Sequence, residues 1–387
     1  MDDLFFNKEH KMIQNMVREF AESDILPIAA KLDEKEEFPT KLVKQMGELG
    51  LMGMNIPEEY GGSGLDTVSY ATAVMELARA DASVAITMAA HTSLGTLPVL
   101  LYGSDKQKNI YLPKLASGEM IGAFGLTEPE AGSDAGSTKT TAVKNGEDYI
   151  INGGKIFITN AGKAGLLSFT SQIIHKNKFQ GIGAFIIPTK TKGLLIGPKE
   201  KKMGWRASDT RQIFFDNMKV PKSSLLGGAT NGFRKFLKTL TLGRISVGAL
   251  AIGTAQASYE RALKYSNQRK AFDKLISEFQ SVSFKLADMA TDIEASKLLV
   301  FHAAWMKDQN KDIIKEAAMA KLFASETAMR VTTDAIQIHG GYGYVKEYEV
   351  ERYFRDAKIL EIGEGTSEIQ RLIISRELFK ELQNNAI

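Results

Sequence analysis

The stretch NGFRKFLKTLTLGRISVGALA, residues 231–251, carries the pattern from which the fold of this chain is predicted. Its apolar positions recur in steps of four and three residues, as one face of an amphipathic helix requires. They are Phe233, Leu237, Leu240, Val247 and Ala251. The same alternation returns from Phe279 to Val300 and from Ile313 to Ile338. Long apolar stripes of this kind pack into antiparallel helix bundles, so the sequence predicts a helical bundle here.

Arg244 interrupts the first stripe at a position where its neighbours on the helix face are apolar. A guanidinium group in apolar surroundings is costly unless an anion meets it. Alternatively, the stem of the side chain packs while its charged head reaches solvent. The sequence leaves both interpretations open.

A second informative stretch is EIGEGTSEIQR, residues 361–371, which predicts a tight loop followed at once by a fourth helix. Glycines on both sides of Glu364 free the backbone from regular geometry. Ser367 is a suitable N-cap, Gln370 follows three residues later as in a capping box, and apolar residues behind them predict a buried helix. A carboxylate held in such a loop is a candidate general base, and the alternative is an acidic surface loop.

The rest of the chain divides into two regions that differ in the spacing of their apolar residues. Residues 7–118 show helical spacing with proline breaks, whereas residues 120–228 show short apolar runs and turn signals, including Asn145-Gly146. Asn152-Gly153-Gly154 separates two of these runs. We therefore predict a multidomain α+β fold: an all-α domain at residues 1–119, a β-barrel or β-sandwich domain at 120–230, and a four-helix bundle at 231–387.

Composition excludes several classes of protein. The 49 Lys and Arg residues nearly balance the 46 Asp and Glu residues, and no long run of one charge occurs, which argues against a nucleic-acid or membrane-surface protein. The chain has no cysteine, which excludes disulfides and thiolate chemistry. Its first residues do not resemble a secretory or transit signal, and we expect no apolar run to reach membrane-spanning length. These features predict a cytoplasmic protein.

The sequence lacks the motifs of several common active sites. No H-E-x-x-H, G-x-S-x-G or P-loop occurs, and the five histidines are scattered, so no metal site is predicted. The glycine-rich run at residues 339–343 follows a helix rather than a strand, which indicates a helix end, although its amides could still approach a phosphate. The segment FGLTEPEAGSD, residues 124–134, lies at a domain boundary and is either a linker or a cofactor loop.

Six stretches follow one another in a recognisable order: LTEP…GSD at residues 126–134, FITN at 157–160, SDTR at 208–211, RKAF at 269–272, QIHGG at 337–341 and EGTSEIQR at 364–371. Together they resemble the motif set of the acyl-CoA dehydrogenases, close to the short- and medium-chain branch that includes butyryl-CoA dehydrogenases. The resemblance covers essentially the whole chain.

The resemblance implies a homotetramer that oxidises a short- or medium-chain acyl-CoA to the trans-2-enoyl-CoA. Glu364 would remove the α-proton, and FAD, held partly across a subunit interface, would accept the β-hydride at N5. Electron transfer flavoprotein would receive the electrons, and neither nucleic acid nor membrane would be a partner. Alternatives that stay open are the enoyl-CoA reductase direction, a branched-chain substrate, an oxidase, and a scaffold that binds acyl-CoA or flavin without catalysis.

The same resemblance assigns binding residues by position. Those near the flavin ring would be Phe124, Leu126, Thr127, Ser133, Phe157, Ile158 and Thr159. Those for the rest of FAD would be Arg269, Phe272, Gln280, Gln337, Gly340, Gly341, Thr366 and Glu368. Those for the acyl-CoA would be Ser133, Thr241, Leu242, Gly243, Arg244 and Gly365.

Two departures from the family pattern bear on the site. Gly363 stands where an aromatic residue usually precedes the base, which would leave room for a bulkier acyl group. Some relatives carry the base at the helix position that is Gly243 here, and glycine cannot serve, so the resemblance leaves Glu364 as the candidate.

Overall fold

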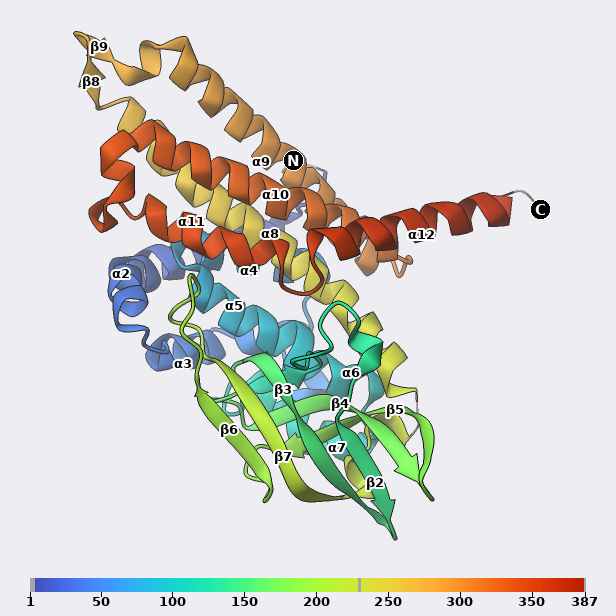
Figure 1. Cartoon of the computed structure of the whole chain (residues 1–387). Helices are drawn as coiled ribbons and strands as arrows, with labels where there is room; N and C mark the ends of the chain where they lie inside the picture. Colours follow the sequence, from blue (N-terminus) through green and yellow to red (C-terminus); the bar gives the residue numbers. More distant parts are fainter. Residues whose placement is uncertain (1–3, 229–230, 386–387) are drawn as a thin grey trace.

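The first region of the chain is helical, as its apolar periodicity predicts (Figure 1). The computed structural model describes residues 4–228 and 231–385, so the predicted boundary at residue 230 lies outside the described residues. The helices here are α1 (Lys8–Phe20), α2 (Leu26–Lys35), α3 (Thr40–Glu48), α4 (Thr67–Ala80), α5 (Ala82–Ala90), α6 (Leu97–Tyr102) and α7 (Asp105–Ala116). Every residue of α5 is buried, so this helix runs through the core.

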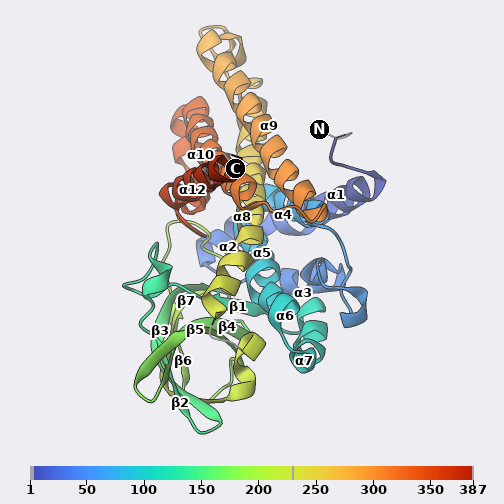
Figure 2. The ribbon, with the colours of Figure 1, turned by 90° about the vertical axis from the view of Figure 1, so that its right-hand side faces the viewer.

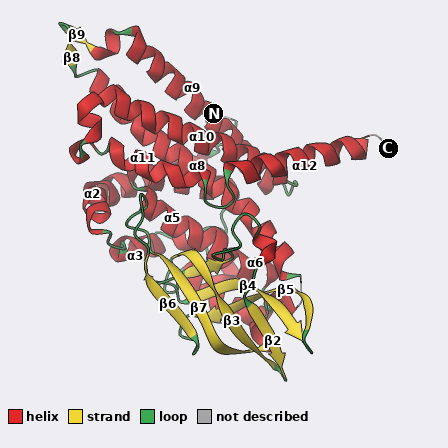
Figure 3. Cartoon of the chain, in the orientation of Figure 1, coloured by secondary structure: helices red, strands yellow, loops and turns green. Residues whose placement is uncertain are grey.

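The middle region is a curved β-sheet domain (Figure 3). Its strands are β1 (Gly122–Gly125), β2 (Thr141–Asn145), β3 (Asp148–Thr159), β4 (Leu166–His175), β5 (Lys178–Pro188), β6 (Leu194–Lys199) and β7 (Thr210–Pro221). The strand order is β1-β4-β2-β3-β7-β6, and β5 pairs with β4. The predicted hairpin at Asn145-Gly146 is confirmed, because Asn145 pairs with Asp148 across the turn.

The predicted break at residues 152–154 is wrong. Strand β3 continues through it, and the register shift between Ile151 and Gly153 accommodates the glycines as a bulge. Gly153 has a φ of 137°, and a Cβ there would lie 2.7 Å from Thr140, so only glycine lets the strand pass.

The last region confirms the three long apolar stripes as α8 (Gly232–Ser266), α9 (Gln280–Asp308) and α10 (Ile314–His339). A hairpin of β8 (Lys270–Ala271) and β9 (Lys274–Leu275) joins α8 to α9 at the end of the bundle away from the β domain (Figure 1). Two further helices are α11 (Val350–Lys358) and α12 (Ser367–Asn385). Helix α8 runs from the β domain to the far end of the bundle (Figure 2).

The prediction for the start of α12 is corrected in two respects. Thr366, not Ser367, caps the helix, because its Oγ1 accepts from the amide of Ile369 at 3.3 Å. The helix is also not buried along its length: Leu372 is 62% exposed, and α12 projects away from the bundle (Figure 1). Ile373 is buried, so the contact of α12 with the bundle is made by its first turns.

The expectation that no apolar run reaches membrane-spanning length is also corrected. The helical stretches Ala82–Tyr102 and Gly232–Ser266 are long and apolar enough by length and composition. Their most apolar windows are 89% and 78% buried inside the protein, however, as expected of core helices. Their hydropathy therefore reflects packing between the domains.

Candidate functional site

Glu364 lies in the loop between α11 and α12, and its backbone has unusual geometry. Its φ is 53° and that of Gly365 is 95°, both in the left-handed region that side chains rarely adopt. The side-chain amide of Gln370 donates to the carbonyls of Glu364 at 3.3 Å and Gly365 at 2.8 Å. The amide therefore holds the strained loop from the first turn of α12 rather than completing a capping box.

The carboxylate of Glu364 points into the protein, against α8. Its Oε2 is shielded from solvent and has no hydrogen-bond partner among the described residues. A Cβ built on Gly243 would lie 1.8 Å from that oxygen, so the carboxylate occupies space that only glycine leaves free. The shielding of Oε2 argues against a solvated acidic loop, although the loop itself is partly exposed. A buried carboxylate oxygen without a partner is uncommon in proteins and suits a group that acts on a bound ligand.

Two buried cations, Arg244 and Lys321, act on the pKa of Glu364. Arg244 is 6% exposed, so its charged head does not reach solvent as one interpretation of the sequence allowed, and its Nε has no partner among the described residues. Lys321 of α10 is fully buried. Burial raises the pKa of Glu364 to about 7, against the opposing charges of Lys321 and Arg244. A carboxyl group with such a pKa can accept a proton near neutrality.

The residues predicted to lie near the flavin ring belong to β1, to β3 and to the loop that follows β1. The carbonyl of Thr127 accepts from the amide of Ile156 at 2.9 Å, which places the 126–134 loop beside β3. Phe157 has a φ of 60° and is 63% exposed, and Thr159 ends β3. An aromatic ring turned outward from a rigid strand suits stacking on a planar ligand.

A buried ion pair fixes the 126–134 loop to β3. Lys155 donates to Glu128 at 2.7 Å and to the carbonyl of Leu126 at 3.1 Å. Burial opposes ionisation of Glu128, but the charge and hydrogen bond of Lys155 outweigh it and lower the pKa of Glu128 to about 2. Such anchoring argues against a plain linker, because a linker needs no fixed geometry.

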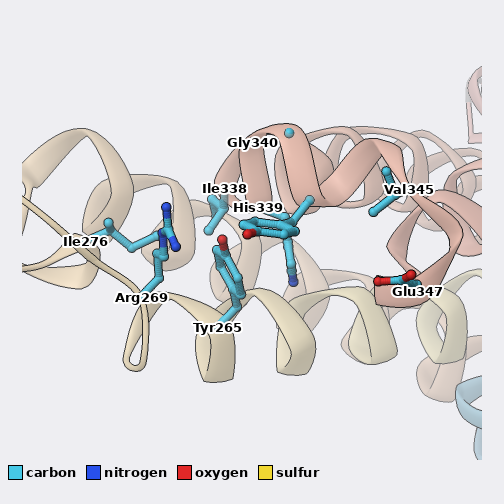
Figure 4. A pocket seen from close by; sticks show the side chains of 10 residues that line it. Tyr265, Arg269, Ile276, Ile338, His339, Gly340, Val345 and Glu347 are labelled. Carbon is cyan, nitrogen blue, oxygen red and sulfur yellow. The ribbon is translucent and has the colours of Figure 1, made fainter.

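A separate cavity of about 590 Å³ is lined by residues from the end of α8 and the end of α10, and Figure 4 shows it from close by. Tyr265 stacks on His339 there, with ring centroids 4.3 Å apart, and Arg269 lies beside them. The guanidinium of Arg269 lies over the ring of Tyr342 at 5.6 Å and has no carboxylate partner among the described residues. Gly340 and Gly341 leave open space where a Cβ would be.

These features fit a phosphate-bearing group. An unpaired arginine beside exposed glycine backbone offers charge and close approach to an anion. Three residues predicted to bind the dinucleotide, Arg269, Gly340 and Gly341, therefore line one cavity. The glycine-rich run also ends α10, as the sequence indicated.

The structure does not bring all the predicted residues together in one chain. Phe272 is 90% exposed on the β8–β9 hairpin, at the opposite end of the molecule from the β domain that carries Thr127 and Thr159 (Figure 1). Gln280 and Gln337 are exposed, and Ser133 is exposed in its loop. Thr366 and Glu368 lie at the start of α12, next to the base loop. Thr241 and Leu242 precede Gly243 on α8.

Sequence reasoning missed Lys321, Gln370 as a loop clamp, and Lys155. Lys321 had a usable signal, because it lies four residues after Ala317 and three before Ala324, on the apolar face of its helix. A cation on such a face is as anomalous as Arg244. The role of Gln370 had no signal of its own, since its spacing from Ser367 matched a capping box.

Three domain descriptions of one family match the chain in order. They are the N-terminal domain of acyl-CoA dehydrogenase at residues 7–119, the middle domain at 123–218 and the C-terminal domain at 230–379. A probable acyl-CoA dehydrogenase of Bacillus subtilis is 53% identical over 96% of this chain and 98% of its own length. The chain belongs to the acyl-CoA dehydrogenase family. A 3-(aryl)acrylate reductase of Clostridium sporogenes is 44% identical, over 97% of this chain and all of its own.

Solved structures show the same acyl-CoA dehydrogenase fold. Butyryl-CoA dehydrogenase from Megasphaera elsdenii superposes with a TM-score of 0.94 at 43% identity, over 97% of this chain and 99% of its own. A structure from work on the electron transferring flavoprotein of Acidaminococcus fermentans has the same TM-score at 45% identity, over 97% and 99%. The protein is thus an oxidoreductase whose cofactor is FAD, and the predicted order of helical, β and helical domains is confirmed.

Replacing Arg269 by glutamine is expected to weaken retention of FAD. Loss of charge-assisted hydrogen bonds to a phosphate lowers affinity roughly 10- to 100-fold. The flavin absorbance that remains after exhaustive dialysis measures this effect. Arg330→Gln is the matched control, since Arg330 is an exposed arginine that pairs with Asp292, donates to Thr327 and lies over the ring of Phe323. Equal flavin content in the two variants would contradict the assignment.

Proposed function

We propose that this protein dehydrogenates short- or medium-chain acyl-CoA thioesters to trans-2-enoyl-CoA, with Glu364 as the base. The observation that carries the proposal is Oε2 of Glu364, which is shielded from solvent, has no hydrogen-bond partner among the described residues and lies against Gly243 of α8. The butyryl-CoA dehydrogenase at 43% identity supports the substrate class.

The residues of the chain account for the proton transfer. The α-proton of a thioester is weakly acidic, so its removal needs a base whose pKa lies near the working pH and whose position is fixed. Burial brings the pKa of Glu364 near neutrality, and the hydrogen bonds of Gln370 to the loop fix its position. FAD, when bound, supplies the acceptor for the β-hydride. Thr127, Phe157 and Thr159 would orient its ring, and the exclusion of water would protect the reacting carbons.

The binding groups support a site completed by a second copy of the chain. The residues for the ring lie on the β domain, and the cavity with Arg269 lies at the other end of the bundle (Figure 1). One extended cofactor bound by both groups must therefore draw them from two subunits. We include in the proposal the homotetramer that the family resemblance implies.

The electron acceptor in this proposal is electron transfer flavoprotein, and the compartment is the cytoplasm. Support for the acceptor is the likeness to the structure from work on that flavoprotein in Acidaminococcus fermentans. Arg244, Thr241 and Ser133 would contact the CoA part of the substrate, by resemblance to the family.

A second candidate is the reverse reaction, reduction of a 2-enoyl-CoA. The relative named as a 3-(aryl)acrylate reductase favours it, because the same base and flavin can work in either direction. Comparing the turnover of acyl-CoA with an oxidant and of enoyl-CoA with reduced flavin distinguishes the two. The faster direction at equal substrate concentration decides between them.

Anaerobic titration of the flavin-loaded protein tests the proposal. Butyryl-, octanoyl-, isobutyryl- and isovaleryl-CoA are added while the visible flavin band is followed. Bleaching by one of the straight-chain esters is expected, and faster bleaching by a branched ester would show that Gly363 has opened the pocket. A bound flavin that no ester reduces would contradict dehydrogenation.

Flavin reduction is expected to accelerate as pH rises through about 7. The pKa of Glu364 is raised to about 7, so below that pH the group is protonated and cannot accept a proton. Above it the carboxylate is available, and the rate levels off. Anaerobic stopped-flow measurements at saturating ester across this pH range follow the effect. A rate that stays constant or falls through neutrality would contradict Glu364 as the base.

A further inference from the structure

Lys321 is a buried cation that the reaction as proposed does not use. It lies on α10, its side chain is fully buried, and the described residues place no carboxylate within salt-bridge distance of it. Its ammonium donates to the carbonyl of Gly365 at 2.8 Å, which is its only hydrogen bond in the described part of the chain. A buried lysine without an ion-pair partner is costly, so the position calls for a functional explanation.

The carbonyl that Lys321 holds belongs to the residue after the base. Glu364 has a φ of 53°, a left-handed geometry that is costly for a residue other than glycine, whereas Gly365 adopts its φ of 95° readily. The Gly365 carbonyl accepts two donors, Lys321 from α10 and Gln370 from α12. The strained loop is thus fixed to two helices at the peptide that follows the base.

The charge of Lys321 also acts on the base. Burial lowers the pKa of Lys321 to about 8, and Glu364 is the largest influence that opposes this shift. Lys321 is in turn the largest influence that opposes the raised pKa of Glu364. The other charged groups that face Lys321 are Glu361 before the loop, Arg244 on α8, Glu326 on α10 and Glu368 on α12.

We propose that Lys321 is a positioning residue for catalysis, which clamps the Glu364 loop through the Gly365 carbonyl and favours the ionised carboxylate. The inference rests on the proposed function, because it gives Glu364 the role of base. One side chain thus has two roles. Its hydrogen bond fixes the position of the carboxylate, and its positive charge stabilises the ionised form.

The test compares Lys321→Met, which removes donor and charge, with Lys321→Gln, which keeps a donor and removes the charge. The rate constant of flavin reduction and its half-saturation are measured by anaerobic stopped flow with butyryl-CoA as a function of pH. Lys321→Met should lower the rate constant by about tenfold or more, with half-saturation nearly unchanged, since the loss falls on the reacting geometry. In both variants the pH midpoint should rise by about one unit.

Lys315→Met is the matched control. Lys315 lies on the same helix, and its ammonium pairs with Glu381 on α12 rather than with the loop. Its rate and pH midpoint should equal those of the parent protein. If Lys321→Met does not fold, the pH midpoint of Lys321→Gln carries the test.

Two outcomes would overturn the inference. One is a folded, flavin-loaded Lys321 variant with the rate and pH midpoint of the parent, and the other is an equal shift in Lys315→Met. Failure of the proposed function looks different, because the parent protein itself would then show no flavin reduction with any ester. The two failures are therefore distinguishable in one set of measurements.

Discussion

Glu364→Gln is expected to retain FAD and bind acyl-CoA but to reduce its flavin about 10²- to 10⁴-fold more slowly. The amide has nearly the shape of the carboxylate, so the packing against Gly243 is kept while the proton acceptor is lost. Anaerobic stopped flow with butyryl-CoA gives the rate constant, and the flavin spectrum reports the cofactor content.

Glu361→Gln is the control for this variant. Glu361 lies three residues earlier, and its partly exposed side chain pairs with Lys358 at 2.6 Å. Its replacement should leave flavin reduction within about twofold, because a partly exposed pair between neighbouring residues contributes little. A Glu364→Gln protein that reduces its flavin as fast as Glu361→Gln would remove Glu364 from the mechanism.

Gly243→Ala is expected to have the second largest effect. The added methyl group would lie 1.8 Å from Oε2 of Glu364, so the carboxylate must move. Misplacement of a reacting group by about 1 Å can slow a reaction about 10²-fold. The same assay applies, and the folded state is followed by thermal unfolding.

Gly248→Ala provides the comparison on the same helix. Its added methyl group would meet a methyl group of Val300 at 2.7 Å, within the bundle and away from the base. We expect some loss of thermal stability from overpacking but flavin reduction like that of the parent. Loss of the reaction in both variants would mean that helix packing, not the carboxylate position, is responsible.

The long helices were predictable because the apolar residues that they bury repeat at helical spacing within one continuous segment. The stripes around Val247, Met289 and Ala324 each follow one helix face, and each helix formed where its stripe lies. Helix α11 was not predicted, since it is short and rich in charged residues. Strand β3 likewise passes through Gly153 because its pairing with β7 is a tertiary property that local turn signals do not contain.

The site was predictable only in part, for a related reason. The sequence singled out Glu364 by its glycines and Arg244 by its place on an apolar stripe. It could not show that the carboxylate lies against Gly243, since these residues are distant in the chain and meet only through the packing of the loop on α8. The misassigned cap has the same origin, because Thr366 and Ser367 are both good caps and the loop geometry selects Thr366.

The length of α8 has a consequence for how defects spread. Gly243 and Tyr265 lie on one uninterrupted helix, so the base site and the distal cavity of a chain are about 30 Å apart along it. If each FAD is shared between copies, a chain with a damaged cavity deprives its neighbour of cofactor while its own base stays intact. Two impaired chains, one altered at Arg269 and one at Glu364, would then restore a working site when they assemble together.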